Sequence, residues 1–170
     1  MKTAWLPSSV KQRKGEDNMG NLYLETKKKN EELMNKTFEG TVFFAFSDKQ
    51  FEEGMKKIGA KDSSELYKLG CGGFYKKTDS EKIHQMYVDM EANEAKALEE
   101  GGEEYAYQMF ACELADHEFD YTMEIEDTLD ALAYEPEEIG KNPVLYAGLE
   151  RALQKYGVTP GCFGIEKEVA

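Results

Sequence analysis

The sequence is poor in the residues that most often perform catalysis or build a covalent framework. Its 170 residues contain two histidines, His84 and His117, and three cysteines. Cys71, Cys112 and Cys162 are odd in number and lack paired CxxC spacing, so neither a disulfide framework nor a zinc knuckle is expected. No G-x-S-x-G, papain-like or phosphate-loop motif is present. We therefore expect a non-enzymatic protein without catalytic residues or cofactors.

Long apolar segments are also missing. No run approaches the roughly 18 residues of a membrane span, and Met1 to Gly20 lacks the continuous apolar stretch of a secretory signal. These absences predict a cytoplasmic protein. Hydrophobic residues still make up 41% of the chain, which is enough for a buried core in a chain of this length.

Positive charge is scarce in one long segment, residues 91–140. This segment carries seventeen Asp and Glu residues against a single Lys96, a net charge of −16, while the whole chain has −13. Neutralising phosphate requires Lys and Arg, so we expect no direct binding to nucleic acid or anionic lipid. The excess instead favours a basic partner, cations, or simple solubility.

Local patterns predict a single α+β domain over residues 21–157, with a flexible arm at 1–20 and a tail at 158–170. Continuous β-branched and aromatic residues predict a central strand over 40–46. The glycines that precede 72–77 predict a turn followed by an edge strand. We expect these strands to form a small antiparallel sheet covered by four to six helices.

Apolar residues at helical spacing mark the helices, and capping residues mark their ends. Ser47 and Gln50 form a capping box, and Gly59 is a stop signal. Residues 116–123 alternate in polarity, which favours a strand or a structured loop. Helical patterns occur over about 22–36, 48–58, 62–69, 80–100, 103–114, 128–133 and 142–156, and four to six helices are expected to cover the sheet.

A metal site is an alternative that spacing alone can test. An EF-hand loop begun at Asp116 places Tyr121 where a glycine is required, and His117-Glu118 lacks the second histidine of H-E-x-x-H. Two other possibilities are not excluded. One is a divalent-cation site without a motif spacing, and the other is an enzyme or metal-dependent binder centred on four residues. The first would use Asp116, Glu118, Asp120, Glu124 and Asp127, and the second Asp116, His117, Glu118 and Asp120.

Four stretches carry a resemblance to a known family. They are Phe44–Gly54 (FAFSDKQFEEG), Leu69–Phe74 (LGCGGF), Glu113–Phe119 (ELADHEF) and Asp127–Leu132 (DTLDAL). Over about residues 40 to 155 the chain resembles an uncharacterised family of small proteins encoded by phages and other mobile elements of gut bacteria. The family has no established reaction. The resemblance implies a cytoplasmic setting in a bacterial host and an anti-defence role, such as an anti-CRISPR or anti-restriction protein.

Carboxylates at helical spacing can form a rigid array that imitates the charge pattern of a nucleic-acid backbone. We therefore expect an inhibitor that occupies the basic nucleic-acid-binding surface of a defence enzyme such as a guide-RNA effector nuclease. The residues expected to bind this partner are Glu113, Asp116, Glu118, Asp120, Glu124, Glu126, Asp127, Asp130, Glu135, Glu137 and Glu138.

Two further interpretations stay open, and the oligomeric state is not predicted. The acidic helices could simply keep the protein soluble. Alternatively, the chain could be a scaffold or oligomerisation module that uses an apolar surface patch of Tyr105, Tyr107, Phe110 and Phe119.

Overall fold

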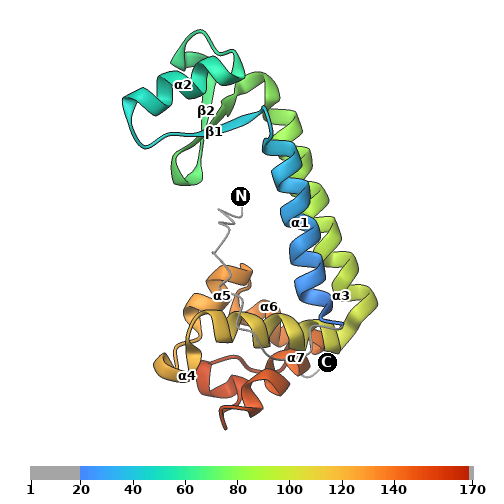
Figure 1. The fold of residues 1–170 in the computed structure, drawn as a ribbon. Coiled ribbons are helices and arrows are strands. Elements are labelled where there is room, and N and C mark those ends of the chain that lie inside the picture. Colours follow the sequence, from blue (N-terminus) through green and yellow to red (C-terminus); the bar gives the residue numbers. More distant parts are fainter. Residues whose placement is uncertain (1–19, 169–170) are drawn as a thin grey trace. The chain divides into compact units, whose positions relative to one another are not determined.

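The computed structural model describes residues 20–168 and contains, within that range, seven α-helices and a three-stranded antiparallel sheet (Figure 1). The predicted α+β class and antiparallel sheet are confirmed, with more helices than the four to six predicted. The elements are α1 (Leu22–Phe38), β1 (Val42–Phe44), α2 (Asp48–Ile58), β2 (Leu66–Leu69), β3 (Gly73–Lys76), α3 (Ser80–Asp116), α4 (Phe119–Thr122), α5 (Glu126–Leu132), α6 (Pro136–Lys141) and α7 (Pro143–Gln154).

The described chain divides into two compact units. Residues 28–93 form the sheet unit, and residues 20–27 together with 94–168 form the acidic unit. The predicted domain span of 21–157 stays a prediction, and the predicted arm, apart from Gly20, lies outside the described residues. Within residues 20–168, every helix is too short or too polar to span a lipid bilayer.

In the sheet unit, β3 lies between β1 and β2. The predicted central strand, 40–46, is therefore an edge strand, and the predicted edge strand, 72–77, is the central one. The error arose because apolar residues on both sides of β1 suggested burial between two neighbours. Phe43 is indeed buried, but Phe44 on the opposite side is 48% exposed, so β1 is only partly covered.

The segment 62–69 is not a helix as predicted. Asp62 accepts a hydrogen bond from the Ser64 backbone N–H at 2.8 Å, which caps one short 3₁₀ turn. The chain then extends into β2, whose Tyr67 lies opposite Tyr75 of β3. Pairing with β3 therefore overrides the weak helical spacing of this stretch.

The start and the end of α2 follow the predicted signals. Ser47 accepts from the Gln50 N–H at 3.3 Å, while the Gln50 side chain accepts from the Phe46 N–H rather than from Ser47. Gly59 ends the helix in the left-handed conformation with φ 70°. Gly54 also has a packing role, because a Cβ there would lie 1.9 Å from the Phe43 ring.

The two helices predicted at 80–100 and 103–114 are parts of α3, interrupted at Gly102. Gly102 adopts φ 54° and ψ −136°, a conformation that is essentially restricted to glycine. The stretch 116–123, predicted as a strand or loop, contains the single-turn helix α4. Glu118 precedes this turn and Met123 follows it, and both have a left-handed backbone conformation that caps the helix. The alternation of polar and apolar residues here therefore does not mark a strand.

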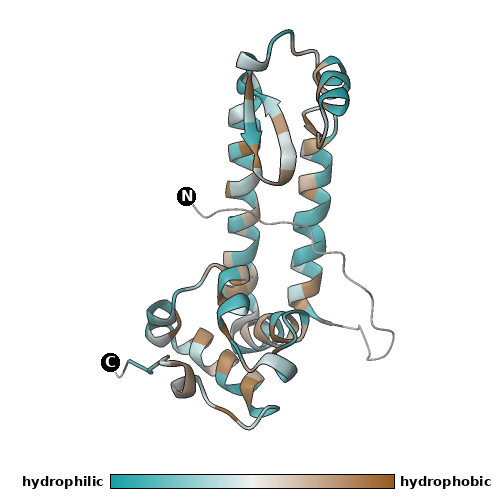
Figure 2. Cartoon of the chain, turned by 90° about the vertical axis from the view of Figure 1, so that its left-hand side faces the viewer, coloured by the Kyte–Doolittle hydropathy of each residue, from teal (hydrophilic) through white to brown (hydrophobic). Residues whose placement is uncertain are grey.

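The end of the described chain packs onto the same unit. Helix α7 begins as predicted, with Asn142 accepting from two backbone N–H groups and Pro143 in the first turn. Residues 158–168, predicted as a tail, contribute the fully buried Ile165, and the Phe163 ring lies 5.7 Å from that of Phe119. Helices α4 to α7 carry both hydrophobic and hydrophilic stretches, as expected for helices packed around a core (Figure 2).

Candidate functional site

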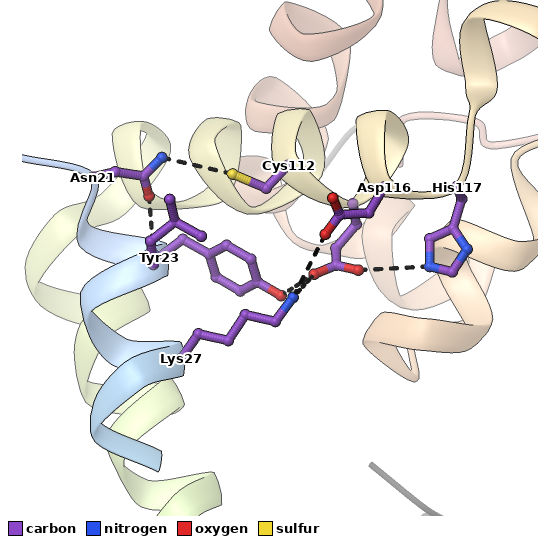
Figure 3. Close-up of polar contacts among 8 residues, drawn as sticks. Asn21, Tyr23, Lys27, Cys112, Asp116 and His117 are labelled. Atoms are coloured by element: carbon purple, nitrogen blue, oxygen red, sulfur yellow. Dashed lines mark hydrogen bonds and ion pairs between the residues drawn. The ribbon is translucent and has the colours of Figure 1, made fainter. Parts of the chain in front are cut away.

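A polar cluster fastens the first turns of α1 to the last turns of α3 within the acidic unit (Figure 3). The Tyr23 hydroxyl donates to Glu113 Oε1 at 2.5 Å, and Lys27 Nζ also lies 2.5 Å from that oxygen. His117 Nε2 lies 3.6 Å from Glu113 Oε2, and Lys27 Nζ lies 3.9 Å from Asp116 Oδ2. Both oxygens of the buried Glu113 carboxylate therefore have partners.

Helical spacing assembles this cluster. Tyr23 and Lys27 are four residues apart on α1, and Asp116 and His117 follow Glu113 by three and four residues, so each set shares one helix face. Lys27 Nζ also lies 5.3 Å from the centroid of the Tyr23 ring. The five side chains thus form one connected group of charges and hydrogen bonds.

The pKa shifts in the cluster favour a structural role over nucleophilic catalysis. Burial, followed by the Glu113 charge, raises the pKa of Tyr23 far above its ordinary value. Burial also raises the pKa of the neighbouring Cys112 thiol, whose Sγ lies 3.6 Å from Asn21 Nδ2. Both groups are therefore protonated at neutral pH, whereas nucleophilic attack requires the phenolate or the thiolate.

Glu113 differs from the other ten predicted partner-binding residues. It is 5% exposed and bound to Tyr23 and Lys27, so its carboxylate is engaged inside the chain. The prediction treated it as a surface charge because it lies within the acidic segment and Glu side chains are usually exposed. The remaining ten are all exposed, namely Asp116, Glu118, Asp120, Glu124, Glu126, Asp127, Asp130, Glu135, Glu137 and Glu138.

Buried apolar residues hold these ten carboxylates in place. Phe119, Ile125, Leu129 and Ile139 alternate with them along the chain, and all four belong to the core of the acidic unit. The Phe119 ring packs at 4.9 Å from the Tyr156 ring of the segment that follows α7. The charges of 116–138 are therefore attached to folded backbone and not to a loose acidic tail.

The helix ends accommodate part of the negative charge. Two pairs of acidic residues lie in first turns, where the positive end of the helix dipole favours them, and Glu135 and Glu138 form a reciprocal capping box. Across the part of the chain that the structure describes, no lysine, arginine or histidine forms an ion pair with a carboxylate of 118–138. Within residues 20–168, the carboxylates of 118–138 are therefore compensated by backbone dipoles and solvent. The first-turn pairs are Glu126 with Asp127 in α5 and Glu137 with Glu138 in α6.

The alternative metal centre receives no geometric support. Asp116 and His117 point toward the Lys27–Glu113 group (Figure 3), while Glu118 and Asp120 are exposed on and beside α4. Within residues 20–168, no three His, Cys, Asp or Glu side chains are arranged to hold a metal ion. The residues of the divalent-cation site without a motif spacing, which extends to Glu124 and Asp127, do not converge either.

A family model described as "Family of unknown function (DUF7659)" matches residues 22–155. The chain belongs to this family. Comparisons with curated proteins and with solved structures gave no match.

The DUF7659 region begins at the first residue of α1 and ends one residue after α7. It therefore contains the Tyr23–Glu113 cluster and all eleven predicted carboxylates. Membership in an uncharacterised family agrees with the resemblance found in the sequence. The phage setting and the anti-defence role stay predictions.

The apolar surface patch predicted for a scaffold is not at the surface. Tyr105, Phe110 and Phe119 are 2%, 0% and 0% exposed. Tyr107 is half-buried, with the Arg151 guanidinium carbon 3.9 Å from its ring centroid. The prediction failed because the aromatic residues of α3 and α4 turn inward and form the core of this DUF7659 unit.

Sequence reasoning missed Tyr23 and Lys27 as partners of the acidic segment. Their spacing on α1 is ordinary, and nothing local links them to Glu113, which lies 90 and 86 residues away. One signal was available, because Glu113 is the only charged residue between Phe110 and Ala115. A single charge within an apolar helical run predicts a buried, paired group.

Proposed function

We propose that this DUF7659 member is a non-enzymatic binding protein whose acidic surface, Asp116 to Glu138, engages the basic nucleic-acid-binding surface of a protein partner. The observation that carries this proposal is the array of ten exposed carboxylates in the acidic unit. The carboxylates of 118–138 within this array have no ion-pairing cation in residues 20–168. Solubility alone requires charge but not a fixed arrangement of it.

Crowded like charges raise the free energy of the folded protein. A partner that presents Lys and Arg against them relieves this repulsion and also releases counterions, so complex formation weakens as salt rises. A guide-RNA effector nuclease has such a surface, because it holds a nucleic-acid duplex in a positively charged channel. Occupation of that channel would block the nuclease without any chemistry by the inhibitor.

The test is cleavage of target DNA by a purified guide-RNA effector nuclease, titrated with the full-length chain at several salt concentrations. Inhibition should weaken as salt rises. It should be lost when Glu124, Glu126, Asp127 and Asp130 are replaced by Lys. A second variant with Gln and Asn at these positions separates loss of charge from the unfavourable placement of Lys at the start of α5.

The matched control reverses four exposed carboxylates of the sheet unit, Glu31, Glu32, Glu39 and Glu52. Both reversals change the net charge equally, so a general electrostatic effect would weaken inhibition in both variants. Circular dichroism establishes that each variant is folded. Unchanged inhibition by a folded acidic-unit variant, or equal loss in the control, would overturn the proposal.

A further inference from the structure

The two faces of the sheet are covered differently. Residues opposite one another on neighbouring strands share a face. Phe43 and Phe74 form one opposed pair, and the Phe51 ring of α2 packs against both at 5.7 and 4.9 Å. Helix α2 therefore covers this face (Figure 1).

The opposite face carries aromatic side chains from all three strands. Tyr67 lies opposite Tyr75 with ring centroids 5.9 Å apart, and Phe44 lies opposite Gly73. Phe46 lies two residues beyond the end of β1, and its ring lies beside Gly72, next to Gly73, which the Phe44 ring contacts. These four side chains, Phe44, Phe46, Tyr67 and Tyr75, are called the aromatic face.

The aromatic face is open to solvent to an unusual degree. Phe46 is 79% exposed, Phe44 48% and Tyr67 47%, although the Phe38 ring of α1 lies 6.3 Å from Phe44. Burying these side chains would be favourable by about 25 cal/mol for each Å² of apolar surface. Exposed aromatic side chains gathered on one face therefore indicate a surface that binds a ligand or partner.

Glycines shape this surface. A Cβ at Gly73 would lie 3.1 Å from the Phe44 ring and 3.0 Å from Leu69 Cβ, and one at Gly72 would lie 2.9 Å from the Phe46 ring. The two phenylalanine rings thus rest against backbone that has no side chain of its own. Each ring can present its outer side to a flat ligand.

The segment 66–78, which contains β2 and β3, differs in net charge from the whole chain. Residues 66–78 contain Lys68, Lys76 and Lys77 but no Asp or Glu. The nearest acidic residues are Glu65 before the segment and Asp79 after it. Lys77 Nζ lies 5.3 Å from the centroid of the Tyr67 ring, which places one cation directly beside the aromatic face. The occupant that complements this surface is an anion with flat apolar groups.

We propose that the aromatic face binds single-stranded nucleic acid. Unpaired bases would stack on Phe44, Phe46 and Tyr67, and a phosphate would meet Lys77, which combines stacking with a cation as single-strand binding requires. Lys68 lies opposite Phe74 and Lys76 opposite Leu66, so these two lysines belong to the other face of the sheet. The net charge of the chain predicts no nucleic-acid contact, but the sheet is locally cationic and the negative charge lies mostly in the acidic unit. The proposal does not depend on the proposed function of that unit.

The first experiment is a fluorescence-anisotropy titration of the full-length chain into a labelled single-stranded oligothymidylate of about 15 nucleotides, in about 50 mM salt. Phe46→Ala and Tyr67→Ala should each weaken binding by at least about 5-fold, since one stacked base is worth about 1 kcal/mol or more. Tyr121→Ala is the matched control, because Tyr121 is 82% exposed in the acidic unit. A duplex of the same length should bind more weakly.

The second experiment uses the lysines. Lys77→Gln should reduce the slope of log affinity against log salt by about 0.7, the contribution of one phosphate contact to a single strand. Lys49→Gln, at a side chain of α2 that is 85% exposed, should leave the slope unchanged.

Three outcomes would overturn the proposal. They are failure of the folded wild-type chain to bind the oligonucleotide, equal loss in the Tyr121→Ala control, and binding that Phe46→Ala and Tyr67→Ala leave intact. If light scattering instead detects self-association that Phe46→Ala abolishes, with no oligonucleotide binding, the face is a protein interface and the nucleic-acid assignment is wrong. Loss of nuclease inhibition in the acidic-unit variants has no bearing on these results.

Discussion

The two units of this chain share helices α1 and α3 but differ sharply in charge. The sheet unit, 28–93, has eleven Lys residues and twelve Asp and Glu residues. The described residues of the acidic unit have six Lys and Arg residues against twenty Asp and Glu residues, a net charge of −14. Almost the entire charge imbalance of the protein therefore belongs to one unit.

The hydrophobic core is also larger in the acidic unit. The acidic unit has a single cluster of fifteen buried hydrophobic residues, whereas the sheet unit has two separate clusters of three. A larger apolar core can offset the repulsion among exposed carboxylates. A high surface charge is therefore tolerated where the buried apolar core is largest.

The largest expected effect is removal of a central core side chain from the acidic unit. Phe119→Ala should reduce the free energy of unfolding by about 3–5 kcal/mol, because it deletes a fully buried ring that packs against Tyr156 and Phe163. Urea unfolding at low and high salt measures the loss. Salt should restore part of the stability by screening the carboxylates, and a loss below about 1 kcal/mol would break the comparison. Tyr121→Ala is the exposed control.

A smaller loss is expected when the packing of the sheet unit is disturbed. Alanine favours helices over glycine by about 1 kcal/mol, yet Gly54→Ala should destabilise by about 1–3 kcal/mol because its Cβ would overlap the Phe43 ring. Hydrogen exchange over 28–93 should locate the loss, and Glu52→Ala on the exposed side of α2 serves as the control. A stabilised Gly54→Ala protein would show that this core adapts more readily than its separate clusters suggest.

Alkaline pH should affect the acidic unit more than the sheet unit. Burial raises the pKa of Tyr23, Tyr105 and Tyr134 in the acidic unit, and of Tyr87 in the sheet unit. Above pH about 10 the unfolded chain releases these protons while the folded chain retains them, so stability falls as pH rises. Tyr23 alone should contribute a slope of up to about 1.4 kcal/mol per pH unit.

Unfolding measured from pH about 8 to 11 tests this slope. Tyr23→Phe lowers stability at every pH because the bond to Glu113 is lost, but it should also flatten the alkaline decline. An unchanged slope in that variant would mean that Tyr23 ionises as easily in the folded chain as in the unfolded one.

The smallest effects concern one helix cap in each unit. Ser47→Ala removes one hydrogen bond to a backbone N–H, while Asn142→Ala removes two, at 3.0 and 3.2 Å. Each substitution should cost about 0.5–2 kcal/mol, with the larger loss for Asn142. Thermal unfolding compares the two, and Asn142→Asp, which keeps the acceptor oxygen, should restore most of the stability. Equal losses would show that the second bond adds nothing.

Features set by neighbouring residues were predictable from the sequence. The caps at Ser47 and Asn142 and the stop at Gly59 depend on residues within four positions, so their signals survive in the one-dimensional pattern. The α+β class followed from the same local signals. The strand order could not be predicted in this way. An apolar run indicates that a strand can be buried but not how many strands pair with it, and β1 is an edge strand.

In the candidate site, too, local features were predictable and long-range contacts were not. Exposure of ten of the eleven carboxylates agrees with their polar helix positions. Glu113 was misplaced because its partners, Tyr23 and Lys27, come from the other end of the chain. The inward orientation of Tyr105 and Phe110 also depends on helices that pack from distant segments, so a surface patch could not be excluded from spacing alone.

The bond from Tyr23 to Glu113 also implies an order of events in time. Residues 20–27 are the first described part of the acidic unit to leave the ribosome, but their partner on α3 lies 90 residues later. All of 28–93 is synthesised in between, and its strands pair within one continuous stretch. Since segments close in sequence meet first, we expect the sheet unit to fold while the chain is still growing. The acidic unit, which carries nearly all of the net negative charge, then folds last.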